Sequence, residues 1–201
     1  MPQKEKVIII GAGLSGPLMA ILLARKGYTV SLYERRSDMR LTQISAGRSI
    51  NLALSDRGVA PLQKIGVDKV VLNETVAMHG RMIHSVNGST NMQPYSGREG
   101  EYINSVSRGG LNITLMNEAE RNNIPIYFDH RCIEADLETG DVMFLNEKTG
   151  ETIRDKAAVV IGTDGAGSAV RNAMLKNSGR LRFNFSQDYL EHGYKAVSYT
   201  H

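Results

Sequence analysis

A glycine pattern near the start of the chain constrains the fold more than any other feature of the sequence. Three glycines have the spacing G-x-G-x-x-G over residues 11–16, directly after a short β-branched run at residues 6–10. An apolar stretch with helical spacing follows at residues 14–26, and a second β-rich run at residues 29–33. A strand, a helix and a strand in this order make a βαβ unit. Because its two strands run parallel, the pattern predicts an α/β fold with a parallel sheet.

Each glycine of this turn has a physical reason. Gly11 permits the tight turn off the strand, Gly13 lets the backbone approach a pyrophosphate, and Gly16 lets the helix pack closely on the strand. The helix that begins near Ser15 directs its free N–H groups at that phosphate. Glu34, at the end of the second strand, can accept hydrogen bonds from ribose hydroxyls, and its charge argues against a ribose 2′-phosphate. The alternative is a glycine-rich turn with a surface glutamate.

A second motif distinguishes FAD from NAD, which the glycine turn alone does not. After a buried apolar run at residues 157–161 come Asp164, Gly165, Ser168 and Arg171, and this spacing resembles the D-G-x-x-S-x-x-R motif of the aromatic-hydroxylase class of flavoproteins. Asp164 can orient water or amide dipoles near a pyrophosphate, Gly165 permits a close turn, and Arg171 can pair with an anionic group. The alternative is a plain strand-to-helix turn in which Ser168 caps the helix.

The rest of the chain alternates helical and strand patterns. Helices are expected at residues 55–65, ended by Gly66, and from a Ser107 cap to residue 122. Strands are expected at residues 78–85 and 102–106, with a hairpin turn at Asn87-Gly88, and at residues 124–128, 131–135, 141–146, 151–154, 157–161 and 194–199. Residues 35–48 are expected to form a polar loop.

These patterns predict a Rossmann-like FAD-binding βαβ core with strand-rich insertions that begin a substrate-binding sheet. Residues 1–75 and 104–180 are expected to form a discontinuous FAD-binding domain. Residues 76–103 and 181–201 are expected to form part of a substrate-binding β-sheet domain.

Composition excludes several other classes of function. The 201 residues carry a net charge of +3 with basic residues spread along the chain, and Trp is absent, which argues against nucleic-acid binding. Cys132 is the single cysteine, so neither an internal disulfide nor a Cys/His metal site is expected. No apolar stretch is long enough to span a bilayer, so no membrane segment is expected in this chain. Oligomeric state is not indicated.

Segments spread over almost the whole chain are more specific than the glycine turn. They comprise residues 47–55, residues 81–85, Tyr102 with residues 105–108, and residues 185–187 with Tyr189 and residues 192–194. Together these segments resemble the kynurenine 3-monooxygenase family of class A FAD-dependent aromatic hydroxylases. The resemblance implies FAD- and NADPH-dependent hydroxylation of L-kynurenine to 3-hydroxykynurenine with O2, a step of tryptophan catabolism on the kynurenine pathway toward NAD biosynthesis.

The resemblance also implies site residues, one position at a time. Arg81 and Tyr95 match the family's residues that bind the substrate carboxylate; read without the resemblance, they are a surface strand residue and a loop aromatic. Arg108 matches an arginine that contacts FAD at a helix start, and Cys132 matches a position on the adenine side that binds through its backbone. The further positions that match residues lining the nucleotide or flavin are Ser15, Glu34, Arg35 and Ala53.

No residue resembles a catalytic base, a nucleophile or a metal ligand, because the bound cofactor carries the chemistry in such enzymes. We expect structural roles for His84 and His130. We also expect the chain to be a truncated N-terminal part of such an enzyme, since the family's second flavin motif is not found in it. The resemblance implies a cytoplasmic location for this chain and, for a full-length eukaryotic form, leaves the mitochondrial outer membrane open. The alternatives are a non-catalytic or unstable FAD-binding fragment and another aromatic hydroxylase or halogenase on the same scaffold.

Overall fold

The computed structural model describes residues 5–41 and 51–192. It contains a parallel four-stranded sheet in which the strand order is β12-β1-β2-β8. These strands are β1 (Lys6–Ile10), β2 (Thr29–Tyr33), β8 (Ile126–Tyr127) and β12 (Val159–Gly162). The helix α1 (Ser15–Arg25) connects β1 to β2, so the predicted βαβ unit is confirmed. Gly27, at φ +96°, ends the turn after α1 as the sequence predicts.

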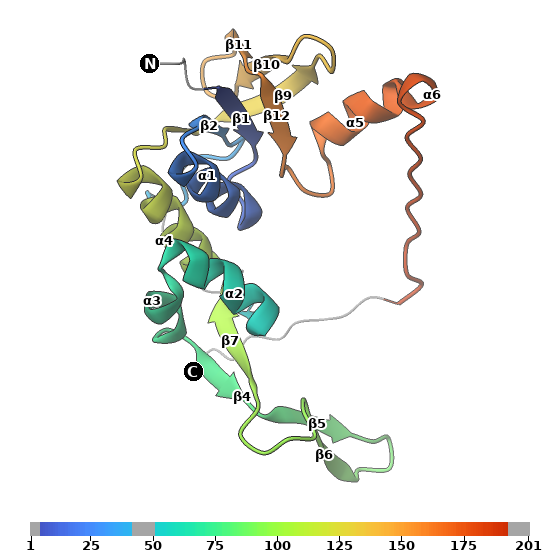
Figure 1. Cartoon of the computed structure of the whole chain (residues 1–201). Coiled ribbons are helices and arrows are strands. Elements are labelled where there is room, and N and C mark those ends of the chain that lie inside the picture. The colour runs from blue at the N-terminus through green and yellow to red at the C-terminus, as the bar shows by residue number, and fades with distance from the viewer. Residues whose placement is uncertain (1–4, 42–50, 193–201) are drawn as a thin grey trace.

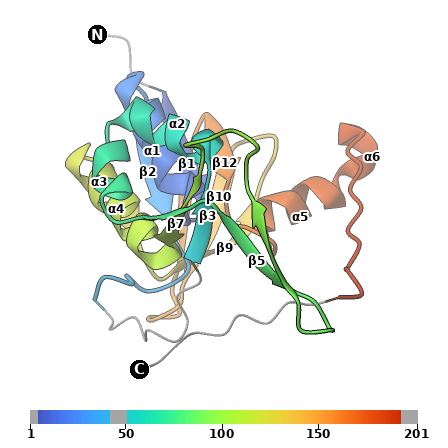
Figure 2. The same ribbon diagram turned by 90° about the horizontal axis from the view of Figure 1, so that it is seen from below.

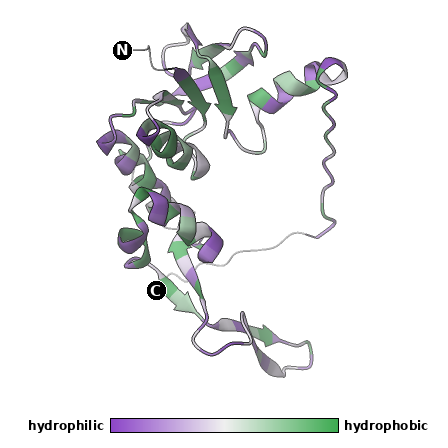
Figure 3. Cartoon of the chain, viewed as in Figure 1, coloured by the Kyte–Doolittle hydropathy of each residue, from purple (hydrophilic) through white to green (hydrophobic). Residues whose placement is uncertain are grey.

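Alternate residues of β1 enter two different hydrophobic cores, as the period-2 geometry of a strand requires. Val7 and Ile9 pack with α1 and with α4 (Arg108–Arg121) on the helical face of the sheet. Ile8 and Ile10 pack on the opposite face, in a core that includes the fully buried Phe144. Burying each such side chain stabilises the fold by roughly 1.5–3 kcal/mol. Figure 3 accordingly shows β1, β12 and α1 among the most hydrophobic elements.

An antiparallel sheet covers the face of the parallel sheet that the helices leave open. Its order is β11-β10-β9, and its strands are β9 (His130–Ala135), β10 (Asp141–Asn146) and β11 (Thr152–Lys156). Gly140 and Gly150 make the two connecting turns at φ +72° and +76°, a conformation that glycine adopts without strain. Figure 2 shows α1, α2 and α4 on one side of β1 and the strands β9 and β10 on the other.

A second group of strands lies beyond the helices α2 (Asp56–Ile65) and α3 (Asp68–Leu72), away from the parallel sheet (Figure 1). It consists of an antiparallel sheet of β3 (Asn51–Leu54), β7 (Ile103–Ser107) and β4 (Val76–Met78), and of a hairpin of β5 (Gly80–His84) and β6 (Thr90–Pro94). Most residues of the hairpin are exposed. A two-stranded ribbon of this kind has little stability by itself.

The last described part of the chain leaves the parallel sheet after β12. It forms α5 (Ala169–Lys176) and α6 (Ser178–Leu181), and an extended segment then continues to residue 192 (Figure 1).

Most of the predicted elements are confirmed. Ser107 accepts the N–H of Gly110 as the cap of α4, Gly66 ends α2 at φ +77°, and the Asn87-Gly88 turn connects β5 to β6. The strand predicted at residues 124–128 is wrong in length, since only residues 126–127 pair with β2. The short elements β3, α3 and α6 were not predicted, and α5 was expected only in the alternative in which Ser168 caps a helix. The strand predicted at residues 78–85 is wrong in its bounds, since Met78 ends β4 and residues 80–84 form β5 in another sheet. The strand predicted at residues 194–199 and part of the predicted loop at residues 35–48 lie outside the described residues.

The predicted division into two domains stays a prediction. The central strand β7 of the second sheet pairs with β3 on one side and with β4 on the other. β3 lies in the predicted FAD-binding part and β4 in the predicted substrate-binding part, so this sheet crosses both of the boundaries near residues 76 and 103. Within residues 5–41 and 51–192, no helix has the length and apolar character needed to cross a membrane. The same described residues hold no cluster of three or more His, Cys, Asp or Glu side chains that could hold a metal ion.

Candidate nucleotide-binding site

A cleft of about 510 Å³ lies at the carboxyl ends of β1, β2 and β12. This is the edge at which parallel α/β sheets bind their ligands. The residues that line this nucleotide cleft are Ile10, Gly11, Gly13, Tyr33, Glu34, Arg35, Arg36, Arg108, His130, Arg131, Cys132, Thr163, Asp164, Gly165, Ala166 and Gly167. The cleft therefore brings together the two sequence motifs, which lie about 150 residues apart in the chain, as well as the predicted residues Arg108 and Cys132.

The glycine turn is shaped by close backbone packing. A Cβ atom on Gly11 would lie 2.6 Å from the carbonyl oxygen of Thr163, and one on Gly16 would lie 1.9 Å from the carbonyl oxygen of Gly11. A Cβ atom on Gly13 would meet nothing within 4 Å. Gly11 and Gly16 are therefore required by the protein's own packing, whereas Gly13 leaves open space beside the cleft. The three predicted reasons for these glycines agree with this geometry.

Side chains from two distant elements support the glycine turn. Thr163, directly after β12, places its hydroxyl 2.9 Å from the carbonyl oxygen of Ile10 and 2.8 Å from that of Gly11. The buried Asn112 of α4 donates from Nδ2 to the carbonyl oxygen of Ala12 at 2.9 Å. Neither residue was predicted as a site residue. Asn112 could not be identified because a polar residue within a helical pattern gives no sign of the backbone that it contacts.

Glu34 is a buried, ionised carboxylate in the wall of the cleft, with 6% of its surface exposed. Its Oε2 accepts the N–H of Ala12 at 2.8 Å, and its Oε1 accepts the backbone N–H and the Nε–H of Arg36 at 2.9 and 2.8 Å. Burial alone would raise the pKa of Glu34, but these hydrogen bonds outweigh it and hold the pKa below its usual value. The alternative of a surface glutamate is therefore wrong.

Arg36 was not among the predicted site residues, although its neighbour Arg35 was. Both arginines line the cleft, but Arg36 is the one that pairs with Glu34. With Arg108 at the start of α4 and Arg131 of β9, four arginines line the cleft. Such a lining favours an anionic ligand.

The second motif forms a turn between β12 and α5. The Oδ2 of Asp164 accepts the N–H of Ala169 at 2.6 Å, while its Oδ1 is buried and has no hydrogen-bond partner within the described part of the chain. Ser168 accepts the N–H of Arg171 at 3.0 Å, so the capping interpretation of this serine is confirmed. Gly165, at φ +76°, allows the turn. The free Oδ1 of Asp164 gives the motif an acceptor that a plain capped turn does not need.

Among residues 5–41 and 51–192, Arg171 contacts backbone carbonyl groups and an aromatic ring, so its expected pairing with an anionic group stays a prediction. Its guanidinium donates to the carbonyl oxygens of Gly165 and Ala166 and lies 4.9 Å from the ring centre of Phe185. Arg171 therefore stabilises the turn by binding two of its backbone carbonyl groups.

Tyr33 and Cys132 also line the cleft. The ring of Tyr33 stacks between Phe144, with ring centres 3.9 Å apart, and Tyr127, at 4.7 Å. Cys132 is 8% exposed, and burial raises the pKa of its thiol to about 11. The thiol therefore stays protonated near neutral pH, in agreement with a position that contacts a ligand through its backbone.

Five of the predicted site residues do not line the nucleotide cleft. Gly16 is buried in the first turn of α1. Ser15 is exposed at the start of α1, and Ala53 is exposed on β3, which belongs to the second sheet. Arg81 lies on the β5–β6 hairpin, where its Nε donates to the side-chain oxygen of Gln93 at 2.8 Å. Tyr95 lines a separate hollow of about 490 Å³ next to α2 and β7. The structure does not bring Arg81 and Tyr95 into one pocket.

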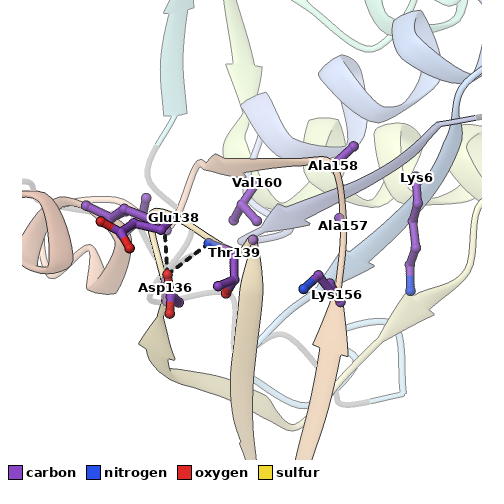
Figure 4. A pocket seen from close by; sticks show the side chains of 12 residues that line it. Lys6, Asp136, Glu138, Thr139, Lys156, Ala157, Ala158 and Val160 are labelled. Carbon is purple, nitrogen blue, oxygen red and sulfur yellow. Dashed lines mark hydrogen bonds between the residues drawn. The ribbon is translucent and has the colours of Figure 1, made fainter.

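A further hollow of about 430 Å³ lies between the β9–β10 turn and the start of β12 (Figure 4). Asp136 accepts the N–H groups of Glu138 and Thr139 there at 2.8 and 3.0 Å, which closes the turn. Neither the glycine turn at residues 11–16 nor any of the sequence-predicted site residues lines this hollow, so the nucleotide cleft is the better candidate for a site.

The geometry of the nucleotide cleft fits the adenosine diphosphate part of a dinucleotide. Open space over Gly13 at the start of α1 suits a pyrophosphate. The buried acceptors of Glu34 and Asp164 suit hydroxyl groups, and the arginines suit phosphate charge.

Comparisons with known proteins agree with this geometry. The family model described as "FAD binding domain" matches residues 4–181. Kynurenine 3-monooxygenase of Anopheles gambiae is 43% identical over 193 residues, which are 96% of this chain and 39% of that protein. Kynurenine 3-monooxygenase of Myxococcus xanthus (strain DK1622) is 42% identical over 197 residues, which are 98% of this chain and 42% of that protein.

Solved structures share the same fold. The tetrameric form of 2-methyl-3-hydroxypyridine-5-carboxylic acid oxygenase has a TM-score of 0.69 at 24% identity and covers 86% of this chain and 42% of its own. The flavin-dependent monooxygenase PieE, solved in complex with FAD and substrate, has a TM-score of 0.69 at 18% identity and covers 86% of this chain and 32% of its own.

The parallel sheet, the glycine turn and the cleft at the strand ends define a dinucleotide-binding α/β domain. The chain belongs to the FAD binding domain family. It is a homologue of kynurenine 3-monooxygenases, so the predicted resemblance is confirmed. The chain spans about two fifths of the length of these relatives.

Proposed function

We propose that the chain holds FAD in the nucleotide cleft as part of an enzyme that hydroxylates L-kynurenine to 3-hydroxykynurenine with NADPH and O2. The observation that carries the FAD site is the convergence of Gly13, Glu34 and Asp164 on one cleft from three separate segments. The support for the reaction is the identity of about 40% with kynurenine 3-monooxygenases over nearly the whole chain.

Each part of FAD has candidate partners among the cleft residues. The pyrophosphate would lie over Gly13, and the adenine-side ribose would lie at Glu34 with Arg35 and Arg36 beside it. The backbone around Cys132 would face the adenine, and Arg108 and Asp164 would lie toward the flavin. Bound FAD supplies the redox chemistry with O2. The protein binds and orients the cofactor.

Arg81 and Tyr95 are proposed to bind the carboxylate of the substrate. Arginine suits this role, since its planar guanidinium can donate two parallel hydrogen bonds to a carboxylate. Arg81 is exposed on its hairpin and Tyr95 is 44% exposed, so both side chains are accessible to a ligand.

The test is the visible absorption spectrum of the purified 201-residue chain after gel filtration with added FAD. We expect a flavin spectrum that elutes with the protein at a ratio near one FAD per chain. L-kynurenine-dependent oxidation of NADPH by the FAD-loaded chain would then support the full reaction. A chain that is folded by circular dichroism but elutes without flavin would contradict the proposed site.

A second candidate is hydroxylation of a different aromatic compound on the same scaffold. The structural neighbours favour it, because they include oxygenases named for other aromatic compounds, such as 2-methyl-3-hydroxypyridine-5-carboxylic acid. The variant Arg81→Ala separates the two candidates. Loss of L-kynurenine binding in this variant supports the first, whereas unchanged binding of a neutral aromatic compound supports the second.

A further inference from the structure

Asp129 is a buried acidic residue that does not line the nucleotide cleft. It lies in the turn between β8 and β9, is 9% exposed, and has a φ of +59°. Residues other than glycine enter this left-handed region at a cost, although aspartate and asparagine tolerate it better than most. A buried charge in such a conformation needs surrounding contacts that hold it there.

The carboxylate of Asp129 joins two separate loops. Its Oδ1 accepts a hydrogen bond from the hydroxyl of Ser37, in the segment that follows β2. Its Oδ2 pairs with the ammonium group of Lys148, in the β10–β11 turn, at 2.7 Å. Lys148 and then Ser37 hold the pKa of Asp129 below its usual value, so the carboxylate is ionised near neutral pH.

The backbone of the same turn holds the segment after β2 as well. The N–H of Asp129 donates to the carbonyl oxygen of Arg36 at 3.1 Å, and the N–H of His130 donates to that of Glu34 at 2.8 Å. The N–H of Glu34 donates to the carbonyl oxygen of Tyr127 at 2.9 Å. Residues 34–37 belong to no helix or strand, so these bonds and the Ser37–Asp129 contact determine where the segment lies.

That segment carries the polar side chains of the proposed ribose site, Glu34, Arg35 and Arg36. Glu34 and Arg36 both reach the cleft from it, and their mutual ion pair depends on the path of the backbone between them. We propose that Asp129 is a positioning residue that fixes residues 34–37 and thereby the ribose side of the cleft. The ligand part of this inference rests on the proposed FAD site.

The test compares Asp129→Gly with two other variants of the full chain. Glycine adopts the positive φ freely, so this substitution removes both side-chain contacts and leaves the turn permitted. Ser37→Ala removes only the contact with the segment and leaves Asp129 unchanged. Asp141→Ala is the matched control. Asp141, like Asp129, is a paired carboxylate that does not line the cleft, and its partners are Arg154 and Lys156.

We expect the Kd for FAD to rise about tenfold in Asp129→Gly and about threefold in Ser37→Ala, with less than a twofold change in Asp141→Ala. A loss of folded protein would lower the binding stoichiometry and leave this Kd unchanged. The affinity for FMN, which lacks the adenosine part, should change less than twofold in every variant. The inference would be overturned if Asp129→Gly weakened FAD and FMN binding equally. It would also be overturned if the control variant bound FAD as weakly as Asp129→Gly does.

Amide hydrogen exchange gives a readout that needs no ligand. Faster exchange at residues 34–37 is expected in Asp129→Gly and Ser37→Ala but not in Asp141→Ala, because the first two loosen the segment. Unchanged exchange there would refute the positioning role. If the native chain bound no FAD, the proposed function would fail, and the exchange experiment would still decide whether Asp129 holds the segment.

Discussion

Replacing Gly13 or Gly16 by alanine adds the same methyl group to the same turn, and the structure gives the two variants opposite outcomes. In Gly16→Ala the new Cβ would lie 1.9 Å from the carbonyl oxygen of Gly11, at least 1.1 Å closer than the 3.0 Å below which real Cβ atoms essentially never lie. Because the clashing atom is backbone, α1 must move away from β1. We expect a loss of about 3 kcal/mol, the upper end for overpacking, and a fall in Tm of about 6–12 °C for a chain of this size.

In Gly13→Ala the new Cβ meets nothing within 4 Å, and Gly13 does not have a positive φ. The unfolded chain loses conformational freedom, so stability should stay the same or rise by about 0.5 kcal/mol. The methyl group occupies the space proposed for the pyrophosphate, so we expect the Kd for FAD to rise at least about thirtyfold.

Thermal unfolding followed by circular dichroism and titration with FAD measure the two effects separately. The reasoning would be refuted by equal Tm values for Gly16→Ala and the native chain. Unchanged FAD affinity in Gly13→Ala would refute the assignment of this space to the ligand.

Three further outcomes are expected. Asn112→Ala leaves the buried carbonyl of Ala12 without its donor and should destabilise the chain by about 2 kcal/mol in chemical unfolding; a change below about 0.5 kcal/mol would contradict the role of Asn112. Glu34→Gln should cost about 2 kcal/mol at pH 7. Because the pKa of Glu34 is lowered in the folded state, this loss of stability should be complete above the unfolded-state pKa of about 4.3 and should shrink as the pH falls through the folded-state pKa. A loss of stability that is independent of pH between 2 and 7 would contradict this reasoning. Cys132, with its pKa of about 11, should react with a thiol reagent at pH 8 at least about a hundredfold more slowly in the folded chain than in denaturant, and equal rates would show that the thiol is not buried.

The parts of the fold that depend on local pattern were predictable. The β-branched run before the glycine turn, the apolar helix after it and the next strand each carry their own periodicity, and all three lie where the sequence places them. The strand β3 was missed because four residues are too few to give a clear pattern, and it exists through pairing with β7, about 50 residues later in the chain. Long-range pairing of this kind leaves no local signal.

The residues of the candidate site also divide into those that a local motif predicts and those that it does not. Gly11, Gly13, Glu34 and Asp164 were identified because each follows a strand within a spaced motif, and all four line the cleft. Arg36 was missed because nothing local distinguishes it from Arg35, and only the path of the backbone decides which of them turns toward Glu34.

The residues that hold the cleft come from parts of the chain that no motif includes. Asn112 of α4 holds the glycine turn, and Asp129, before β9, holds the segment that carries Glu34. Each uses a polar side chain to satisfy or anchor backbone that lies outside helices and strands. Such backbone has no hydrogen-bond ladder of its own, so its shape must be imposed by donors and acceptors elsewhere. A motif therefore identifies which residues can face the ligand, whereas the affinity of the cleft also depends on supporting residues that only the folded structure identifies.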